Sequence, residues 1–595
     1  MPTGSLALRL SRIALLVAAS LLPLAALAEE QAKIDWQSWS PGIFERAKAE
    51  HRFVLLDLGA VWCHWCHVMD EVTYTDPAVI SLLNEKYLAV RVDQDSRPDL
   101  SNRYEDYGWP ATIVFNVDGS EIVKRSGYIP PKPMASLLQA IIDDPSPGPS
   151  AQPEPVITPG TDAGFTAEQR AIMREAFLQA YDEERGGWGT IHHYLDWAAL
   201  EYCLREGASG DAQITARARQ TLTSGLKLID PIWGGVYQYS TDGDWDHPHF
   251  EKIMPFQAEN LRVFSAAATQ WSDPQWLEPA EKIRGYLAQF LTSPEGAFYT
   301  SQDADLVDGE HSADYFALDD AGRRAKGIPR VDRHLYAREN GLAIAGLTTL
   351  YAAGGNAACL EAAKRAAEWT LAHRALDGGG FRHDERDVAG PYLADSLSMA
   401  RACLALYIVT ADRAWLAHTR ETDGFIDNKF HSPIGFVTAA ASPADSLPPK
   451  AQVDENITLA RFANLLFYFT GDAKHRAMAE HAMRFLASPV VIERQGFATA
   501  GLLLADREFR SEPAHITIVG SKDDPAARDL FTSALRHMPA YTRLEWLDER
   551  EGPLPNSDVP FPTLKFAAAF VCANGTCSTP MRKPEQLVQR LAKLK

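Results

Sequence analysis

The sequence predicts a multidomain protein with an N-terminal α/β domain, a large all-α toroid of six helical hairpins and a small α/β C-terminal segment. Three observations carry this prediction. Strand-like and helix-like segments alternate over residues 33–144, six prolines crowd residues 145–159, and glycines followed by an aromatic or apolar residue recur through residues 165–505. At 595 residues the chain is long enough for several separate cores, since domains average roughly 100–200 residues.

The first 28 residues predict an export signal. Arg9 and Arg12 precede a 16-residue apolar run from Ile13 to Ala28, which ends in Ala-Leu-Ala before two glutamates. This is the order of a secretory signal peptide, and the run is short for the ~20 residues that cross a bilayer. We therefore expect cleavage after Ala28, a periplasmic location, and a mature chain without a membrane span.

Residues 33–144 are typical of an α/β domain, because short buried strands alternate with helical segments. Asp118-Gly119 between the last two strands is a hairpin signal. The expected elements follow the order αβαβαββα: helix 40–51, strand 52–60, a helix from 63, strand 88–93, helix 99–107, strands 111–117 and 121–126, and helix 133–143.

Residues 145–164 form a proline-rich, extended linker, and the helical repeats of residues 165–505 follow it. One glycine turn per hairpin predicts six hairpins, which must pack together because each is amphipathic. The 84-residue interval between the third and fourth turns predicts an insertion. The six turns are Gly187-Trp188, Gly235-Val236-Tyr237, Gly296-Ala297-Phe298, Gly380-Phe381, Gly435-Phe436 and Gly496-Phe497.

Residues 506–595 return to a mixed pattern, with strands expected at 515–520, 541–547 and 565–572 and a helix at 525–538. The net charge of −20 argues against a nucleic-acid-binding protein, because a phosphate backbone requires a basic face. The apolar fraction of 46% excludes general disorder.

The most informative motif is Trp62-Cys63-His64-Trp65-Cys66-His67. Cys63 stands where a buried strand passes into a helix, and a helix N-terminus stabilises a thiolate. We expect Cys63 to attack a disulfide and Cys66, one turn later, to resolve the mixed disulfide. His64 and His67 would add positive charge that lowers the pKa of the Cys63 thiol.

The same motif has two other interpretations. It matches c-type haem attachment, which the buried strand before it and the apolar periodicity after it disfavour. Its two cysteines and two histidines also resemble zinc ligands, but a second ligand pair at the usual spacing does not follow in the sequence. We therefore expect neither a metal nor another cofactor.

Two further segments support redox chemistry. Asp57 lies in the middle of the apolar strand, so burial would raise its pKa and let it relay the proton of Cys66. Trp109-Pro110 precedes the strand at 111–117, where a cis bond would place backbone beside the two sulfurs. The remaining interpretation of Asp57 is an ordinary, half-exposed strand residue.

These residues together resemble thioredoxin. More narrowly, Cys63-His-Trp-Cys-His-Val-Met with Gly108-Trp109-Pro110 and Asp118-Gly119 is similar to the thioredoxin-like domain of the spermatogenesis-associated protein 20 (YyaL-type) family. Members of that family join such a domain to a six-hairpin α/α toroid, which resembles N-acylglucosamine 2-epimerases and six-hairpin glycosidases. The resemblance extends to Pro248-His249-Phe250-Glu251-Lys252, Asp303-Ala304-Asp305, Asn340-Gly341 and Cys572…Cys577.

The resemblance implies a polar site within the toroid. Paired carboxylates there would serve as acid and base, and an aromatic ring such as Trp245 would stack on a sugar. Where the family carries Gly-Ala-Pro-Lys-Phe-Pro, this chain has Gly189-Thr-Ile-His-His193, which favours a binding toroid over a catalytic one. The candidate residues are His249, Glu251, Asp303, Asp305, Glu339 and Asp395.

The other cysteines fall into two groups. Cys203, Cys359 and Cys403 lie in apolar helical contexts and are expected to be buried free thiols. Cys572 and Cys577, which are five residues apart, would form a small loop disulfide in an oxidising compartment.

Two hypotheses follow for the whole chain. The first is an exported thioredoxin-like thiol–disulfide oxidoreductase with a Cys63–Cys66 disulfide, whose toroid selects or positions a protein client and which a separate redox partner recharges. The second is a carbohydrate-binding or carbohydrate-processing toroid, with a saccharide as ligand and a structural thioredoxin-like domain. Neither hypothesis involves nucleic acid.

Overall fold

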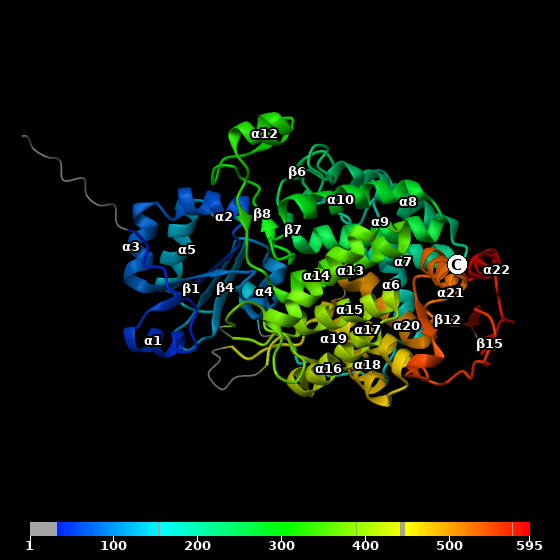
Figure 1. Ribbon diagram of the computed structural model, residues 1–595. Coiled ribbons are helices and arrows are strands. Elements are labelled where there is room, and N and C mark those ends of the chain that lie inside the picture. Colours follow the sequence, from blue (N-terminus) through cyan, green and yellow to red (C-terminus); the bar gives the residue numbers. More distant parts are fainter. Residues whose placement is uncertain are drawn as a thin grey trace, which may run out of the picture.

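The computed structural model describes residues 33–152, 155–387, 389–440, 447–494, 496–573 and 575–594. The expected export signal at 1–28 lies outside the described residues. Figure 1 shows the N-terminal α/β domain and the C-terminal segment on opposite sides of a large helical body.

The N-terminal domain is a four-stranded sheet in the order β2-β1-β3-β4. β1 pairs parallel with β2 and antiparallel with β3, and β3 continues into the β4 hairpin. The strands carry nearly continuous apolar side chains, because helices or the toroid cover both faces. Its elements are α1 (Ile43–Glu50), β1 (Phe53–Gly59), α2 (His64–Val68), α3 (Pro77–Lys86), β2 (Tyr87–Asp93), α4 (Pro98–Tyr104), β3 (Ala111–Phe115), β4 (Glu121–Ser126) and α5 (Pro131–Asp143).

The helical body is a closed ring of two layers, which confirms the predicted α/α toroid. Each inner helix packs on its inner neighbours, and the first outer helix, α6, packs on the last inner helix, α20. The inner helices are α7 (Trp197–Ala208), α9 (Met254–Trp271), α13 (Ala337–Gly354), α15 (Leu393–Thr410), α17 (Val453–Thr470) and α20 (Thr499–Arg510). The outer helices are α6 (Ala167–Gln179), α8 (Ala212–Gly225), α10 (Leu277–Phe290), α14 (Ala357–Arg374), α16 (Arg413–Phe430) and α18 (Ala473–Leu486).

Each glycine turn lies between an outer helix and the next inner helix, and in three of them an amide side chain near the start of that inner helix holds the turn. The side chain of Asn340 accepts from Phe298 N (2.8 Å) and donates to Phe298 O (3.1 Å). Asn456 holds Phe436 in the same way, and Gln257 holds Val236. These buried amides satisfy backbone groups that the turn leaves open, which gives Asn340 a structural role.

The long interval between the third and fourth turns holds an insertion. It contains β8 (Ser301–Gln302), α11 (Ala313–Phe316), α12 (Asp320–Lys326) and β9 (Val331–Asp332), and β8 pairs with β9 and with β7 (Lys252–Ile253). Figure 1 shows this segment rising where the α/β domain meets the toroid. The insertion therefore belongs to the junction between the two domains.

Ion pairs between charged side chains link several of the inner helices. Arg461 from α17 forms ion pairs with Glu201 of α7 and Glu508 of α20, and Glu201 also pairs with Arg262 of α9. Ionic and hydrogen-bonding partners from several inner helices satisfy these groups away from water. Among the described helices, α15 alone has the length and hydropathy of a membrane span, and it is an inner helix with 72% of that stretch buried in the protein.

The C-terminal segment is a four-stranded sheet in the order β13-β12-β14-β15, on which two helices pack. It covers the C-terminal ends of the inner helices. Lys522 Nζ donates to Ala411 O (2.7 Å) after α15, and Arg536 donates to carbonyls at the end of α13. Its elements are β12 (Ala514–Val519), α21 (Pro525–His537), β13 (Thr542–Leu547), β14 (Ala568–Ala573), β15 (Thr576–Cys577) and α22 (Pro584–Leu591).

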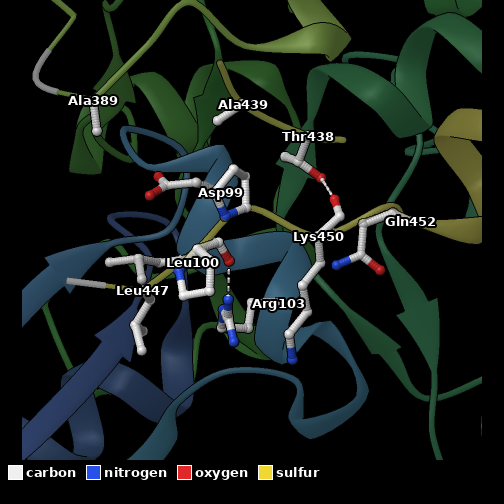
Figure 2. A pocket seen from close by; sticks show the side chains of 11 residues that line it. Asp99, Leu100, Arg103, Ala389, Thr438, Ala439, Leu447, Lys450 and Gln452 are labelled. Atoms are coloured by element: carbon white, nitrogen blue, oxygen red, sulfur yellow. Dashed lines mark hydrogen bonds between the residues drawn. The ribbon is translucent and has the colours of Figure 1, made fainter. Parts of the chain in front are cut away.

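The α/β domain covers the opposite end, where the inner helices begin. Figure 2 shows α4 beside the segment that precedes α17, with Arg103 donating to the Pro448 carbonyl. Asn102 also donates to Glu455 (3.2 Å) and accepts from Gln452 (2.9 Å) through its carbonyl. The toroid is therefore covered at both ends.

Candidate redox site at the domain interface

Cys63 and Cys66 form a disulfide at the start of α2, with their Cα atoms 5.3 Å apart. Cys63 is the residue before the helix, and its Sγ accepts from Cys66 N at 3.2 Å. Cys66 packs against β1, because a Cβ added to Gly59 would lie 3.5 Å from its Sγ. Cys63 is only 4% exposed. The reactive pair thus lies at the end of β1 and is recessed from the surface.

Asp57 lies two residues before Gly59 on β1, so alternation along the strand places its side chain on the face that Cys66 contacts. Burial raises the pKa of Asp57, and the nearby Arg91 guanidinium opposes that rise. Arg91 Nε lies 3.0 Å from Oδ2, and the Tyr74 hydroxyl donates to Oδ1 at 3.0 Å. These two partners, which no sequence motif indicates, both occupy the carboxylate.

The Trp109–Pro110 peptide before β3 is cis, as the sequence predicted. Trp109 packs edge-on against Trp62, with 6.1 Å between ring centroids, and both rings lie in an apolar cluster with Cys63. Toroid residues Ile253 and Phe256 belong to the same cluster. The apolar surroundings of the redox pair therefore come from two domains.

The two motif histidines contact the toroid. His64 Nδ1 lies 2.8 Å from Asp305 Oδ1, and His67 Nδ1 lies 3.1 Å from Asp305 Oδ2. Burial alone would raise the pKa of Asp305, but the hydrogen bonds from His64 and His67 lower it to about 2. Burial alone would lower the pKa of His67, but hydrogen bonding to Asp305 raises it above the ordinary value. Asp305 therefore attaches both ends of α2 to the toroid insertion.

A second contact reinforces the first. Arg330 donates to the Val61 carbonyl (2.6 Å) and to Asp303 (3.0 Å), while Asp303 accepts from Asp305 N (3.0 Å). Burial raises the pKa of Asp303 to about 6. His67, Asp303 and Asp308 offer metal-ligand atoms within 4.8 Å of one another, but Asp305 and Arg330 already bond the first two.

His249 and Glu251 complete the toroid side of the site. His249 stacks on Tyr239, with ring centroids 4.4 Å apart and planes 13° apart. Glu251 is 3% exposed, and its Oε1 accepts from His64 N at 3.4 Å. Lys252, which follows it, is fully buried and pairs with Asp230 at 2.7 Å. That ion pair fixes the segment that carries both candidate residues.

A cleft of about 780 Å³ separates the two domains at Cys63. From the α/β domain it is lined by Trp62–Trp65, Tyr107–Trp109 and Ser126–Tyr128. From the toroid it is lined by His192, Gln238–Tyr239, Thr241–Asp242, Pro248–Glu251, Ala304–Asp305 and His311–Ser312. The structure thus brings four of the six predicted toroid residues, His249, Glu251, Asp303 and Asp305, to the redox pair.

Glu339 and Asp395 lie in a second cluster, beyond β2. His383 Nε2 contacts the Asp95 carbonyl (2.6 Å), and its Nδ1 lies 2.9 Å from Asp395. Burial alone would lower the pKa of His383, but the neighbouring Asp395 raises it to about 9. Glu339 pairs with Arg338 at 2.9 Å. Asp395 thus orients the histidine that contacts the α/β domain, Glu339 bonds its neighbour on α13, and neither carboxylate lines the cleft.

The expected sugar-stacking role of Trp245 is wrong. The ring is 3% exposed, stacks on His193 and donates to the backbone of the first glycine turn. It is therefore a core residue. Arg330, Tyr239 and Asp95 also contact the other domain or line the cleft, although they belong to none of the motifs recognised in the sequence.

The remaining cysteines form a disulfide and three free thiols. Cys572 and Cys577 are bonded across the β14–β15 hairpin. Cys203, Cys359 and Cys403 are buried free thiols, as expected. Burial raises the pKa of each, to about 12 for Cys359 and Cys403. Of the two disulfides in the described residues, Cys63–Cys66 is the one at the interdomain cleft, where Cys63 forms part of the lining.

Comparison with known proteins agrees with this architecture. Residues 24–142 match the thioredoxin-like model described as "Protein of unknown function, DUF255". Mouse spermatogenesis-associated protein 20 is 28% identical over 308 residues, 46% of this chain and 39% of its own length, and the human protein is 27% identical over 308 residues. The match therefore spans about two fifths of these relatives.

The α/β domain also matches shorter segments of redox proteins. The thiol:disulfide interchange protein DsbD of Pseudomonas fluorescens is 32% identical over 83 residues, 13% of this chain and 14% of that protein. A solved sugar epimerase from a ruminal bacterium covers 53% of this chain and 83% of its own, with 15% identity and a TM-score of 0.43. By its described fold the chain joins a thioredoxin-like domain to an α/α toroid, and nearly half of it is similar in sequence to spermatogenesis-associated protein 20.

Proposed function

We propose that the chain is an exported thiol–disulfide oxidoreductase whose toroid selects the client. The observation that carries this proposal is the placement of Cys63 and Cys66 at the start of α2, in a cleft that both domains line. The similarity of the α/β domain to thiol:disulfide interchange proteins supports it.

The proposed chemistry uses the pair in its reduced form. The Cys63 thiolate attacks a client disulfide, one client sulfur leaves as a thiolate, and Cys63 holds the other in a mixed disulfide. Cys66 then attacks Cys63 Sγ, which releases the second client thiol and restores the Cys63–Cys66 disulfide. Two electrons pass to the client, and an external dithiol partner returns them. Asp57, on the same face as Cys66, would accept the Cys66 proton.

The test is redox titration of the purified chain against a dithiol buffer, with free thiols labelled and located by mass spectrometry. We expect Cys63 and Cys66 to gain labels together at one potential, and Cys63→Ser to abolish exchange with an added disulfide. A matched Cys572→Ser, Cys577→Ser double variant should keep it. A Cys63–Cys66 pair that fails to cycle would end the proposal.

Export rests on the sequence alone. A mature N-terminus at Glu29 in the periplasmic fraction would support the export signal. An uncleaved chain in the cytoplasm would contradict it.

The alternative is a saccharide-acting toroid, which the glycosidase-like and epimerase-like architecture supports. In the described structure, ion pairs link inner helices α7, α17 and α20, and the α/β domain covers the end where the inner helices start. A glycan array with the whole chain tests this function. Binding that survives Cys63→Ser and weakens with Glu339→Gln would favour it.

A further inference from the structure

Two buried polar atoms in the wall of the cleft lack a hydrogen-bond partner among the described residues: Glu251 Oε2 and Trp109 Nε1. His249 Nδ1 lies 3.8 Å from Glu251 Oε2, which is beyond hydrogen-bonding distance. An unpaired buried polar atom costs about 1–3 kcal/mol, so such atoms call for an explanation. Glu251 Oε2 is a hydrogen-bond acceptor, and Trp109 Nε1 is a donor.

Both residues lie beside the reactive sulfur. Glu251 accepts from the backbone N–H of His64, the residue that follows Cys63, and Trp109 shares an apolar cluster with Cys63. A ligand sulfur that reaches Cys63 therefore brings its neighbouring groups close to a free carboxylate oxygen and a free indole N–H. A cysteine residue carries an N–H donor and a C=O acceptor within a few bonds of its sulfur.

The walls of the cleft also limit the size of the client. Cys63 is 4% exposed, and toroid segments 248–251 and 304–312 stand across from it. A folded protein needs about 800 Å² of matching surface on each partner, which a cleft with two opposed walls does not offer. A volume of about 780 Å³ lies in the usual range of small-molecule sites, ~300–1,000 Å³.

Aromatic rings line both walls. Tyr239 and His249 stack on the toroid side, and Trp65 stacks on Tyr128 on the other, with 5.8 Å between centroids. Such surfaces suit short organic chains with a mixed polar and apolar character.

We infer that the cleft is a binding site for low-molecular-weight cysteinyl disulfides, in which Glu251 accepts from the ligand N–H and Trp109 Nε1 donates to its carbonyl. This inference rests on the proposed function and names its substrate class. Cys63 attacks one sulfur of the bound disulfide, one cysteinyl thiolate leaves and takes up a proton, and Cys66 releases the second. The ligand gains two electrons, and an external dithiol restores the protein.

The test compares second-order rate constants for three disulfides with the reduced, full-length chain. They are the disulfide dimer of N-acetylcysteine methylamide, bis(2-hydroxyethyl) disulfide, which lacks the N–H and the carbonyl, and a folded protein with a surface disulfide. We expect the cysteinyl compound to react at least about tenfold faster than either, the effect of about 1.4 kcal/mol.

Variants assign the preference to the two atoms. Glu251→Gln and Trp109→Phe should each lower the ratio of cysteinyl to hydroxyethyl rates by about three- to tenfold, mainly through KM. The matched control Glu310→Gln, at an exposed glutamate of the toroid insertion, should keep the ratio. Equal rates for all three disulfides, or a ratio that neither variant changes, would overturn the inference. A pair that reacts with none of these disulfides when reduced, and is not reduced by a dithiol buffer when oxidised, would instead contradict the proposed function.

Discussion

The two ends of the toroid carry different kinds of contact. At the end where the inner helices finish, apolar residues Ala352 and Val409 join Ile516, Ile518 and Phe531 of the C-terminal segment in one buried cluster. At the end where the inner helices begin, the α/β domain is held largely by carboxylates, histidines and arginines. Apolar burial is insensitive to pH, whereas the second set of contacts depends on protonation.

This difference suggests a division of labour. The C-terminal segment extends the core of the toroid, so the two should unfold together. The α/β domain has apolar cores of its own and meets the toroid through polar contacts around a cleft. The attachment of the α/β domain can therefore weaken or strengthen while the toroid stays folded.

The largest effect is expected from a cavity at the apolar end. Leu530 on α21 is fully buried in the cluster that joins the C-terminal segment to the toroid. Leu530→Ala should lower the free energy of unfolding by about 3 kcal/mol, because it removes packing and leaves a void. Thermal unfolding should show one transition at lower temperature for toroid and C-terminal segment. Two separated transitions would show that this end is not a continuous core.

A smaller effect is expected at the polar end. Asp305→Ala removes the partner of both motif histidines and should weaken domain attachment by about 2 kcal/mol. Hydrogen exchange should rise in α2 and in residues 303–312, while the unfolding temperature of the toroid stays the same. Asp314→Ala, at an exposed carboxylate of the same insertion, is the control. Equal exchange in both variants would deny Asp305 this role.

The sequence allowed much of the fold to be predicted, because local signals determine it. Glycine turns marked the six hairpins, and the strand before Cys63 with the cis-proline segment marked the redox fold. The interface was less accessible. His64 and Asp305 are 241 residues apart, and Asn102 and Glu455 are 353 apart. Neither hydrophobic periodicity nor spacing encodes such pairs, so four toroid residues were assigned to a sugar site when they lie at the redox pair.

The Cys572–Cys577 disulfide offers a local test within the apolar end. It closes a short loop between β14 and β15, so its removal should cost about 2 kcal/mol through the entropy of the unfolded chain. Because the hairpin lies at the edge of the sheet, Cys572→Ala with Cys577→Ala should increase exchange in β14 and β15 alone. The cleft and its redox potential should not change. A shifted Cys63–Cys66 potential would reveal coupling between the two disulfides.

Mild alkali should weaken the polar end alone. The folded pKa of His383 is about 9 against an ordinary value of 6.5, so its contribution is complete below pH 6.5 and is lost as pH rises through 9. Burial also raises the pKa of Glu105 and Glu455 at this interface, and raised carboxyl values act in the same direction. Asp395 stays beside His383 in the toroid, so the loss for domain attachment is the contact of Nε2 with the Asp95 carbonyl, whose donor proton is removed as His383 deprotonates. We expect cleavage by a protease within residues 145–164 to accelerate between pH 7 and 8 in the wild type and less in His383→Gln, with the toroid remaining intact. All of these raised pKa values weaken domain attachment as pH rises. A cleavage rate that falls with rising pH would therefore contradict the comparison between the two ends.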